Sequence, residues 1–302
     1  MINALSIDVE EHFQARVMES AVPFQEWPKQ ESRLRQNVHR LLDLFQKFQA
    51  RATFFILGWN AERYPDLVEE IRKEGHEIAC HGYRHMDIYR QSPEEFRADL
   101  ERGRRILEQI THLPIRGYRA PTFSIRQDTL WALDILIEQG FRYDSSIFPI
   151  FHDRYGIPDS PRFPYRIRTP KNKSIREFPL STVSFLGQNF PVAGGGYFRL
   201  LPYALIAKAL LRLNRREMRP AVIYLHPWEL DPGQPRLPIG PLNQLRHYLN
   251  LEATEKKLIH LLKDFRFAPL GEILDREERK VSLPLVQINE EHHRGILEGL
   301  KF

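Results

Sequence analysis

The feature that most constrains the fold of this chain is a repeated alternation between short apolar segments and longer segments with helical periodicity. The apolar segments have the length of buried strands, and the segments between them carry apolar residues at the spacing of three and four that amphipathic helices show. Such alternation is typical of βαβ units, in which helices cover a parallel sheet. We therefore predict an α/β fold with mostly parallel strands, arranged as a distorted β/α barrel.

The predicted elements follow one another along most of the chain. Strands are expected at residues 4–9, 52–57, 77–80, 116–119, 141–144, 176–179, 221–226 and 265–268. Helices are expected at residues 32–48, 61–73, 92–110, 127–139, 202–214 and 251–263, with a helical turn at 270–274. The helix at 202–214 is apolar nearly all round, which favours burial in the core over contact with a membrane. Residues 148–170 are rich in proline and predict a long functional loop.

Length and composition exclude several classes of protein. A chain of 302 residues fits a single α/β barrel, and no run of 18 apolar residues predicts a transmembrane helix. The single cysteine, Cys80, excludes an internal disulfide, and the first residues lack the pattern of a secretory signal, so we expect a cytoplasmic protein. The net charge of +5 comes without a nucleic-acid-binding motif, and the one dense basic segment, 212–219, is interpreted as a solvated helix end. We therefore expect no nucleic-acid partner.

Two histidines of the segment GHEIACHGYRH, His81 and His85, are four residues apart. On a helical turn this spacing puts both imidazoles on one face, where they could bind the same metal ion. A catalytic zinc site has three protein ligands and one open position, so the third ligand would come from elsewhere. Taken alone, the spacing also fits two surface or core histidines.

Ionisable residues stand at the ends of five predicted strands. They are Asp8 with Glu10, His81 with His85, Arg119, Asp144 and His226. In parallel sheets and β/α barrels, catalytic residues lie at the carboxyl ends of the strands. Because burying a charge costs free energy, five such positions at once indicate one active site rather than five structural roles.

Five motifs in the chain resemble those of the NodB-type polysaccharide deacetylases, carbohydrate esterase family 4. They are SIDVEEHF, HGYRH, RAPTFS, YDSSIFP and LHPWE, in that order. The resemblance covers about residues 3–270 and is closest to the branch at exopolysaccharide loci, which includes the PEP-CTERM (exosortase)-associated deacetylases. It implies one catalytic domain over residues 1–275, with a family-specific loop region at 148–200, and a tail at 276–302.

The resemblance also implies the ligands of a divalent metal ion, expected to be Zn²⁺. These are His81, His85 and one carboxylate of the first motif, which is spaced as Asp8-Val9-Glu10 where better-known members carry adjacent aspartates. Either Glu10 or Glu11 could reach the metal. Strand alternation favours Glu10, because it puts Glu10 on the same side as Asp8.

The remaining roles follow from the same resemblance. Asp8 would be the general base, kept ionised by Arg119, and His226 the acid that protonates the leaving nitrogen. Asp144 would orient His226, and the backbone N–H of Thr122 would stabilise the oxyanion. Phe123 would supply an aromatic wall, whereas Trp228 fits a sugar platform and a core aromatic equally well.

The predicted function is removal of N-acetyl groups from amino sugars of a polysaccharide or its precursor. Two alternatives stay open: an amidohydrolase for a small cyclic imide or ureide, and a catalytically silent carbohydrate-binding protein. The partner is therefore a carbohydrate, and the oligomeric state is open. Because the loops at 148–170 and 229–241 follow the strand ends of Asp144 and His226, we expect them to border a groove for at least a disaccharide.

Overall fold

The computed structural model of the protein describes residues 1–152, 154–192 and 194–288. Its main feature is a ten-stranded sheet with the order β10-β1-β2-β3-β4-β5-β7-β6-β12, in which β11 also pairs with β1. All of its strand pairs are parallel except β6 with β7. The predicted α/β class with mostly parallel strands is confirmed. Among the described residues β10 and β12 end the strand path and do not pair with each other, so the barrel is open.

The strands are short, and most lie where the apolar segments predict them. Their bounds are β1 Ile2–Val9, β2 Thr53–Ile56, β3 Glu77–Cys80, β4 Gly117–Tyr118, β5 Tyr143–Asp144, β6 Tyr165–Arg168, β7 Ser174–Glu177, β8 Thr182–Phe185, β9 Gln188–Pro191, β10 Val222–Leu225, β11 Arg266–Ala268 and β12 Leu285–Val286. Strands β8 and β9 form a separate antiparallel hairpin, which the sequence pattern did not predict.

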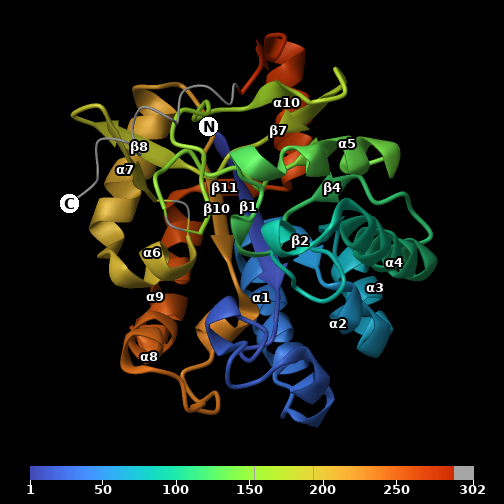
Figure 1. The fold of residues 1–302 in the computed structure, drawn as a ribbon. Helices are drawn as coiled ribbons and strands as arrows, with labels where there is room; N and C mark the ends of the chain where they lie inside the picture. The colour runs from blue at the N-terminus through green and yellow to red at the C-terminus, as the bar shows by residue number, and fades with distance from the viewer. Residues whose placement is uncertain (153, 193, 289–302) are drawn as a thin grey trace, which may run out of the picture.

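The helices surround the sheet (Figure 1). Their bounds are α1 Leu34–Phe48, α2 Gly58–Arg63, α3 Pro65–Lys73, α4 Pro93–Thr111, α5 Trp131–Glu138, α6 Gly195–Leu200, α7 Tyr203–Arg215, α8 Pro241–Tyr248, α9 Leu251–Asp264 and α10 Leu270–Lys280. Within the described chain, no helix has the length and apolar character needed to cross a membrane.

Three predicted boundaries were wrong. The single helix expected at 61–73 is two helices, because Pro65 disfavours the helical conformation for Tyr64, which has φ −129° and ψ 56°. The loop expected at 148–170 contains β6. The helical turn expected at 270–274 is the first part of α10, which continues to Lys280; β12 then pairs with β6, and residues 289–302 of the expected tail lie outside the described residues.

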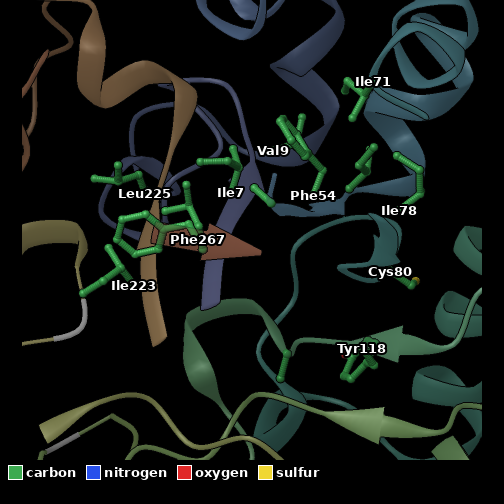
Figure 2. Packing of buried hydrophobic residues seen from close by; sticks show 14 of the residues in the cluster. Ile7, Val9, Phe54, Ile71, Ile78, Cys80, Tyr118, Ile223, Leu225 and Phe267 are labelled. Carbon is green, nitrogen blue, oxygen red and sulfur yellow. The ribbon is translucent and has the colours of Figure 1, made fainter. Parts of the chain in front are cut away.

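The alternation of side chains along β1 separates the core from the site. Ile7 and Val9 point toward the helices and join the large hydrophobic cluster shown in Figure 2. Ser6 and Asp8 alternate with them and point to the other face, where Phe55 lies beneath the Arg119 guanidinium. The strand thus buries an apolar row against the helices and presents a polar row on its inner face.

Candidate active site

One carboxylate and two imidazoles converge at the carboxyl ends of β1 and β3. Glu10 Oε1 lies 3.1 Å from His81 Nε2 and 3.0 Å from His85 Nε2. The ligand atoms of these three buried residues lie within 4.8 Å of one another. The predicted clustering of Glu10, His81 and His85 is confirmed. The set matches the His₂Glu ligation of catalytic zinc sites, so it fits a divalent cation.

The competing carboxylate, Glu11, lies on the other side of the strand end. It accepts hydrogen bonds from the Ser32 hydroxyl and from the backbone N–H groups of Arg33 (3.1 Å) and Leu34 (3.3 Å). These N–H groups belong to the start of α1, where a carboxylate is stabilising. Strand alternation therefore identified Glu10 correctly as the carboxylate that faces the histidines.

The two histidines converge through a loop and not through the helical turn that their spacing suggested. Gly82, with φ +76°, and His85, with φ 53°, both have left-handed backbone conformations that no α-helix contains. The chain reverses between the two histidines and returns the second imidazole toward the first. The predicted meeting of the side chains is confirmed, but the predicted local geometry was wrong.

Neighbouring helices fix the shape of this loop. The carbonyl of Gly82 accepts a hydrogen bond of 2.8 Å from the N–H of Gly58, the first residue of α2. Asp99 of α4 accepts a hydrogen bond of 2.7 Å from the N–H of Tyr83. A Cβ atom at Gly103 of α4 would lie 2.8 Å from the Gly82 oxygen, so only glycine permits α4 to approach this closely.

The third motif orients the first histidine. His81 Nδ1 lies 2.8 Å from the backbone oxygen of Arg119. Because a carbonyl oxygen can only accept, Nδ1 carries a proton, and Nε2, which faces Glu10, is the nitrogen left to bind a metal ion. This is the tautomer that a metal-binding histidine needs.

The predicted base, Asp8, forms an ion pair with Arg119. Its Oδ1 lies 2.6 Å from a terminal nitrogen of the guanidinium, and both side chains are buried. The same guanidinium donates to the Ser6 hydroxyl (2.8 Å) and to the backbone and hydroxyl oxygens of Ser145 (3.0 Å each). With this many contacts Arg119 is rigid, and it holds Asp8 in one position beside Glu10.

The predicted acid, His226, reaches the same cluster from the end of β10. Its Nε2 lies 3.8 Å from Glu10 Oε1, and its Nδ1 lies 3.4 Å from Glu229 Oε2. Burial alone would lower the pKa of His226, but the charges of Glu10, Glu229 and Asp8 outweigh it and raise this pKa to about 9. The imidazole is therefore suited to carry a proton at neutral pH.

Asp144, predicted to orient His226, lies elsewhere. The β5–β7 register places Asp144 opposite Glu177, and its Oδ1 accepts a hydrogen bond of 2.6 Å from the Ser146 hydroxyl. Burial raises the pKa of both carboxyl groups, and for Glu177 the neighbouring charge of Asp144 raises it further. Such a pair is stable when it shares a proton. The carboxylate beside His226 is instead Glu229.

Glu229, and the arginine that forms an ion pair with it, were not identified from the sequence. Arg199 donates a hydrogen bond of 2.8 Å to Glu229 Oε1, and both side chains are buried. Burial would raise the pKa of Glu229, but its contacts with His226 and the charge of Arg199 lower it to about 2. The motif LHPWE could have indicated this contact. Its histidine and glutamate are three residues apart, a spacing that lets a carboxylate in a turn reach the imidazole.

The RAPTFS motif forms a strained turn beside the site. Thr122 and Phe123 have φ of 55° and 53°, which is uncommon outside glycine. The Thr122 hydroxyl is buried without a hydrogen-bond partner among the described residues. Phe123 packs on Tyr224 with ring centroids 4.9 Å apart, so it belongs to the inner core as well as to the site. Strain of this kind is often kept at functional sites.

Trp228 is a core aromatic and not an open sugar platform. Its side chain is buried and stacks on the rings of His226, at 5.1 Å, and His247, at 4.1 Å between ring centroids. With 4% of its surface exposed, the residue has no ring face open to a sugar. Trp228 positions the ring of His226 rather than offering a surface to a ligand.

A cavity of about 190 Å³ lies beside the metal-ligand cluster. His85 forms part of its wall, and the rest comes from residues of the segments 13–27 and 84–90, including Phe24 and Trp27. The loops at 148–170 and 229–241 contribute no residue to this cavity. The walls of this cavity therefore come from the segments after β1 and β3, and the groove that was expected between the two loops stays a prediction.

Two protein-family models and several known proteins match parts of this chain. Residues 22–143 match the family model "Polysaccharide deacetylase", and residues 145–275 match "Domain of unknown function (DUF3473)". A peptidoglycan-N-acetylglucosamine deacetylase of Bacillus cereus is 32% identical over 96 residues, which cover 32% of this chain and 35% of that protein. A peptidoglycan deacetylase of Helicobacter pylori is 29% identical over 110 residues, covering 36% of each. The chain thus matches only about a third of the length of these relatives.

Solved structures show a similar fold at low sequence identity. A candidate polysaccharide deacetylase of Mycobacterium smegmatis has a TM-score of 0.62 and 22% identity, covering 95% of this chain and 93% of the other. The Puue allantoinase has a TM-score of 0.59 and 18% identity, covering 92% and 90%. These likenesses concern the fold. The family models therefore relate residues 22–143 to the polysaccharide deacetylases and residues 145–275 to DUF3473.

Proposed function

We propose that this protein is a metal-dependent hydrolase that removes N-acetyl groups from amino sugars of a polysaccharide or of its precursor. The observation that carries the proposal is the convergence of Glu10, His81 and His85, with His226 3.8 Å from Glu10 and a buried, Arg119-bound Asp8 on the same strand end as Glu10. Amide hydrolysis needs a base, an electrophilic centre and an acid in this arrangement.

Each polar group then has a distinct task. Glu10, His81 and His85 would hold a divalent cation, which would supply Lewis-acid polarisation of the amide carbonyl. Asp8, oriented by Arg119, takes a proton from the attacking water as the new C–O bond forms. The backbone N–H of Thr122 is the proposed donor to the oxyanion.

His226 completes the reaction. Glu229, whose carboxylate lies 3.4 Å from the ring Nδ1, favours the protonated imidazole, which can transfer a proton to the sugar nitrogen as the C–N bond breaks. The products are acetate and a free amino sugar. Glu229, held by Arg199, keeps the imidazole in position while it gains and loses this proton.

The finer assignments belong to the same proposal. The five motifs taken together support a place in the exopolysaccharide-locus branch, which includes the exosortase-associated deacetylases. Zinc is the proposed ion, because borderline-soft Zn²⁺ suits two imidazoles and one carboxylate. The cytoplasmic location stays a prediction, as does the division into a catalytic domain at 1–275 and a tail at 276–302.

Elemental analysis and an acetate-release assay test the proposal together. The purified protein should contain about one equivalent of a divalent metal and should release acetate from N-acetylglucosamine oligosaccharides. An Asp8→Asn variant, with its metal content unchanged, serves as the matched inactive control. Ring opening of allantoin or hydantoin without acetate release would contradict the deacetylase proposal and would indicate an amidohydrolase for small amides. Oligosaccharide binding without hydrolysis of either class would mean a silent carbohydrate-binding protein.

A further inference from the structure

We propose that the β8–β9 hairpin and the outer face of α7 dock onto a membrane surface that carries anionic lipid headgroups. We call this region the hairpin–helix surface and define it by Phe185, Leu186, Phe190, Leu211, Arg215 and Arg216. Of the large hydrophobic side chains that are exposed in the described chain, half lie between Phe185 and Met218. The proposal does not depend on the proposed catalytic function.

The tip of the hairpin carries a leucine that the fold does not need. Leu186 and Gly187 have φ of 49° and 78°, the two positive values of a type I′ turn. Asn, Asp or Gly is preferred at both positions, because a left-handed backbone is unfavourable for other side chains. Leu186 is nevertheless 87% exposed to solvent. It therefore costs stability in the free protein through both its conformation and its exposure.

Two aromatic side chains extend the apolar tip. Phe185 is 59% exposed and Phe190 is 48% exposed, and their ring centroids lie 6.4 Å apart. In the hairpin register Phe190 pairs with Val183, so Phe185 and Phe190 project from the same face. The tip thus presents two phenylalanines and a leucine as one contiguous group.

Helix α7 adds apolar residues and cations beside the hairpin (Figure 1). A terminal nitrogen of Arg212 donates a hydrogen bond of 2.8 Å to the Ser184 oxygen and joins the helix to β8. The sequence pattern favoured burial of this helix, but only one face is buried, and Leu205 and Leu211 are exposed on the other. These leucines alternate with cations at helical spacing, which makes the outer face amphipathic.

The charged side chains of the hairpin–helix surface are all positive. From Phe178 to Arg216 the sequence contains no Asp or Glu, although the whole chain has 39. Within the described part of the chain, Lys208, Arg215 and Arg216 form no ion pair. Apolar side chains flanked by unpaired cations match a bilayer surface, where the former enter the headgroup boundary and the latter bind anionic lipids. A symmetric dimer through this surface is disfavoured, because the arginines of one copy would face those of the other and repel them.

Co-sedimentation with vesicles tests this proposal on the full chain. We expect binding to phosphatidylcholine vesicles that contain phosphatidylglycerol, weak binding to phosphatidylcholine alone, and release by added salt. Leu186→Asn creates an Asn-Gly turn that should fold at least as well, yet it should weaken vesicle binding about tenfold. Arg215→Gln and Arg216→Gln should each weaken it about fivefold.

Control substitutions of the same residue types outside the hairpin–helix surface show whether vesicle binding depends on this surface. Leu245→Asn removes a leucine of α8 that is 58% exposed, and Arg105→Gln removes an exposed cation of α4; neither should change vesicle binding. Release of acetate from a soluble oligosaccharide should be the same in Leu186→Asn as in the unaltered protein. No vesicle binding, equal binding to both vesicle types, or a dimer in light scattering that Leu186→Asn dissociates would overturn the proposal.

Discussion

At the scale of single residues, the base and the metal ligands can be separated by substitution. Asp8 contacts Arg119, whereas the candidate ligand atoms belong to Glu10, His81 and His85. Asp8→Asn should therefore keep the metal and lower kcat about 10²–10⁴-fold, as expected for removal of a general base. His81→Ala should lose metal and activity together. Full activity of Asp8→Asn, measured by acetate release, would show that Asp8 is not the base.

A second residue-scale prediction concerns the carboxylate that orients His226. Glu229 lies 3.4 Å from the His226 ring nitrogen, whereas Asp144 contacts Ser146 and pairs with Glu177. Glu229→Gln should lower kcat at least about tenfold with little change in KM, because the acid is misplaced and not removed. Asp144→Asn should have the smaller effect on kcat. If kcat fell more in Asp144→Asn than in Glu229→Gln, in variants of equal melting temperature, Asp144 and not Glu229 would orient His226.

At the scale of elements, the loop between β3 and α4 determines whether the site forms. Its left-handed positions and its contact with α4 bring His81 and His85 together. Gly103→Ala would add a Cβ atom 2.8 Å from the Gly82 oxygen. The gain in helix propensity is about 1 kcal/mol, but the loop would have to move.

We therefore expect Gly103→Ala to weaken metal binding about 10–100-fold, the range typical of changes behind metal ligands. Isothermal titration with Zn²⁺ after chelation would measure it. Arg105→Ala, an exposed position of the same helix, is the control and should bind zinc normally. If both variants bound zinc equally well, the packing of α4 on the loop would not determine the geometry of the site.

At the scale of the whole molecule, three buried histidines make stability sensitive to acid. Burial lowers the pKa of His12 and His76 to about 4 and that of His247 to about 3, all below the ordinary value of 6.5. A histidine whose folded pKa is lowered favours the folded state above the unfolded pKa. That stability is lost as the pH falls from about 6.5 toward the folded value.

His76 offers the cleanest measurement, because it lies far from the metal ligands and accepts a hydrogen bond of 3.2 Å from the Ala52 N–H. Between pH 7 and pH 5 the unfolding free energy should fall by about 2 kcal/mol more in the unaltered protein than in His76→Gln. Urea unfolding at both pH values provides the comparison. Parallel losses in the two proteins would contradict a neutral, buried His76.

The sequence by itself determined the features that depend on local pattern. Periodicity identified the strands and most helices, because burial repeats every two residues in a strand and every three to four in a helix. Strand alternation was also enough to choose Glu10 over Glu11, since neighbours along a strand face opposite ways. The candidate ligands Glu10 and His81 were identifiable because each directly follows a strand, and His85 was identifiable by its spacing from His81.

Tertiary structure alone decided which side chains meet across the fold. Asp144 pairs with Glu177 because the β5–β7 register sets them opposite each other, and no local pattern fixes a register between strands so far apart in the sequence. Glu229 became the partner of His226 because Arg199, from α6, neutralises it there. The HGYRH loop bends as it does because α2 and α4 supply its hydrogen bonds. Local patterns record which face of an element is buried, whereas packing decides what that face touches.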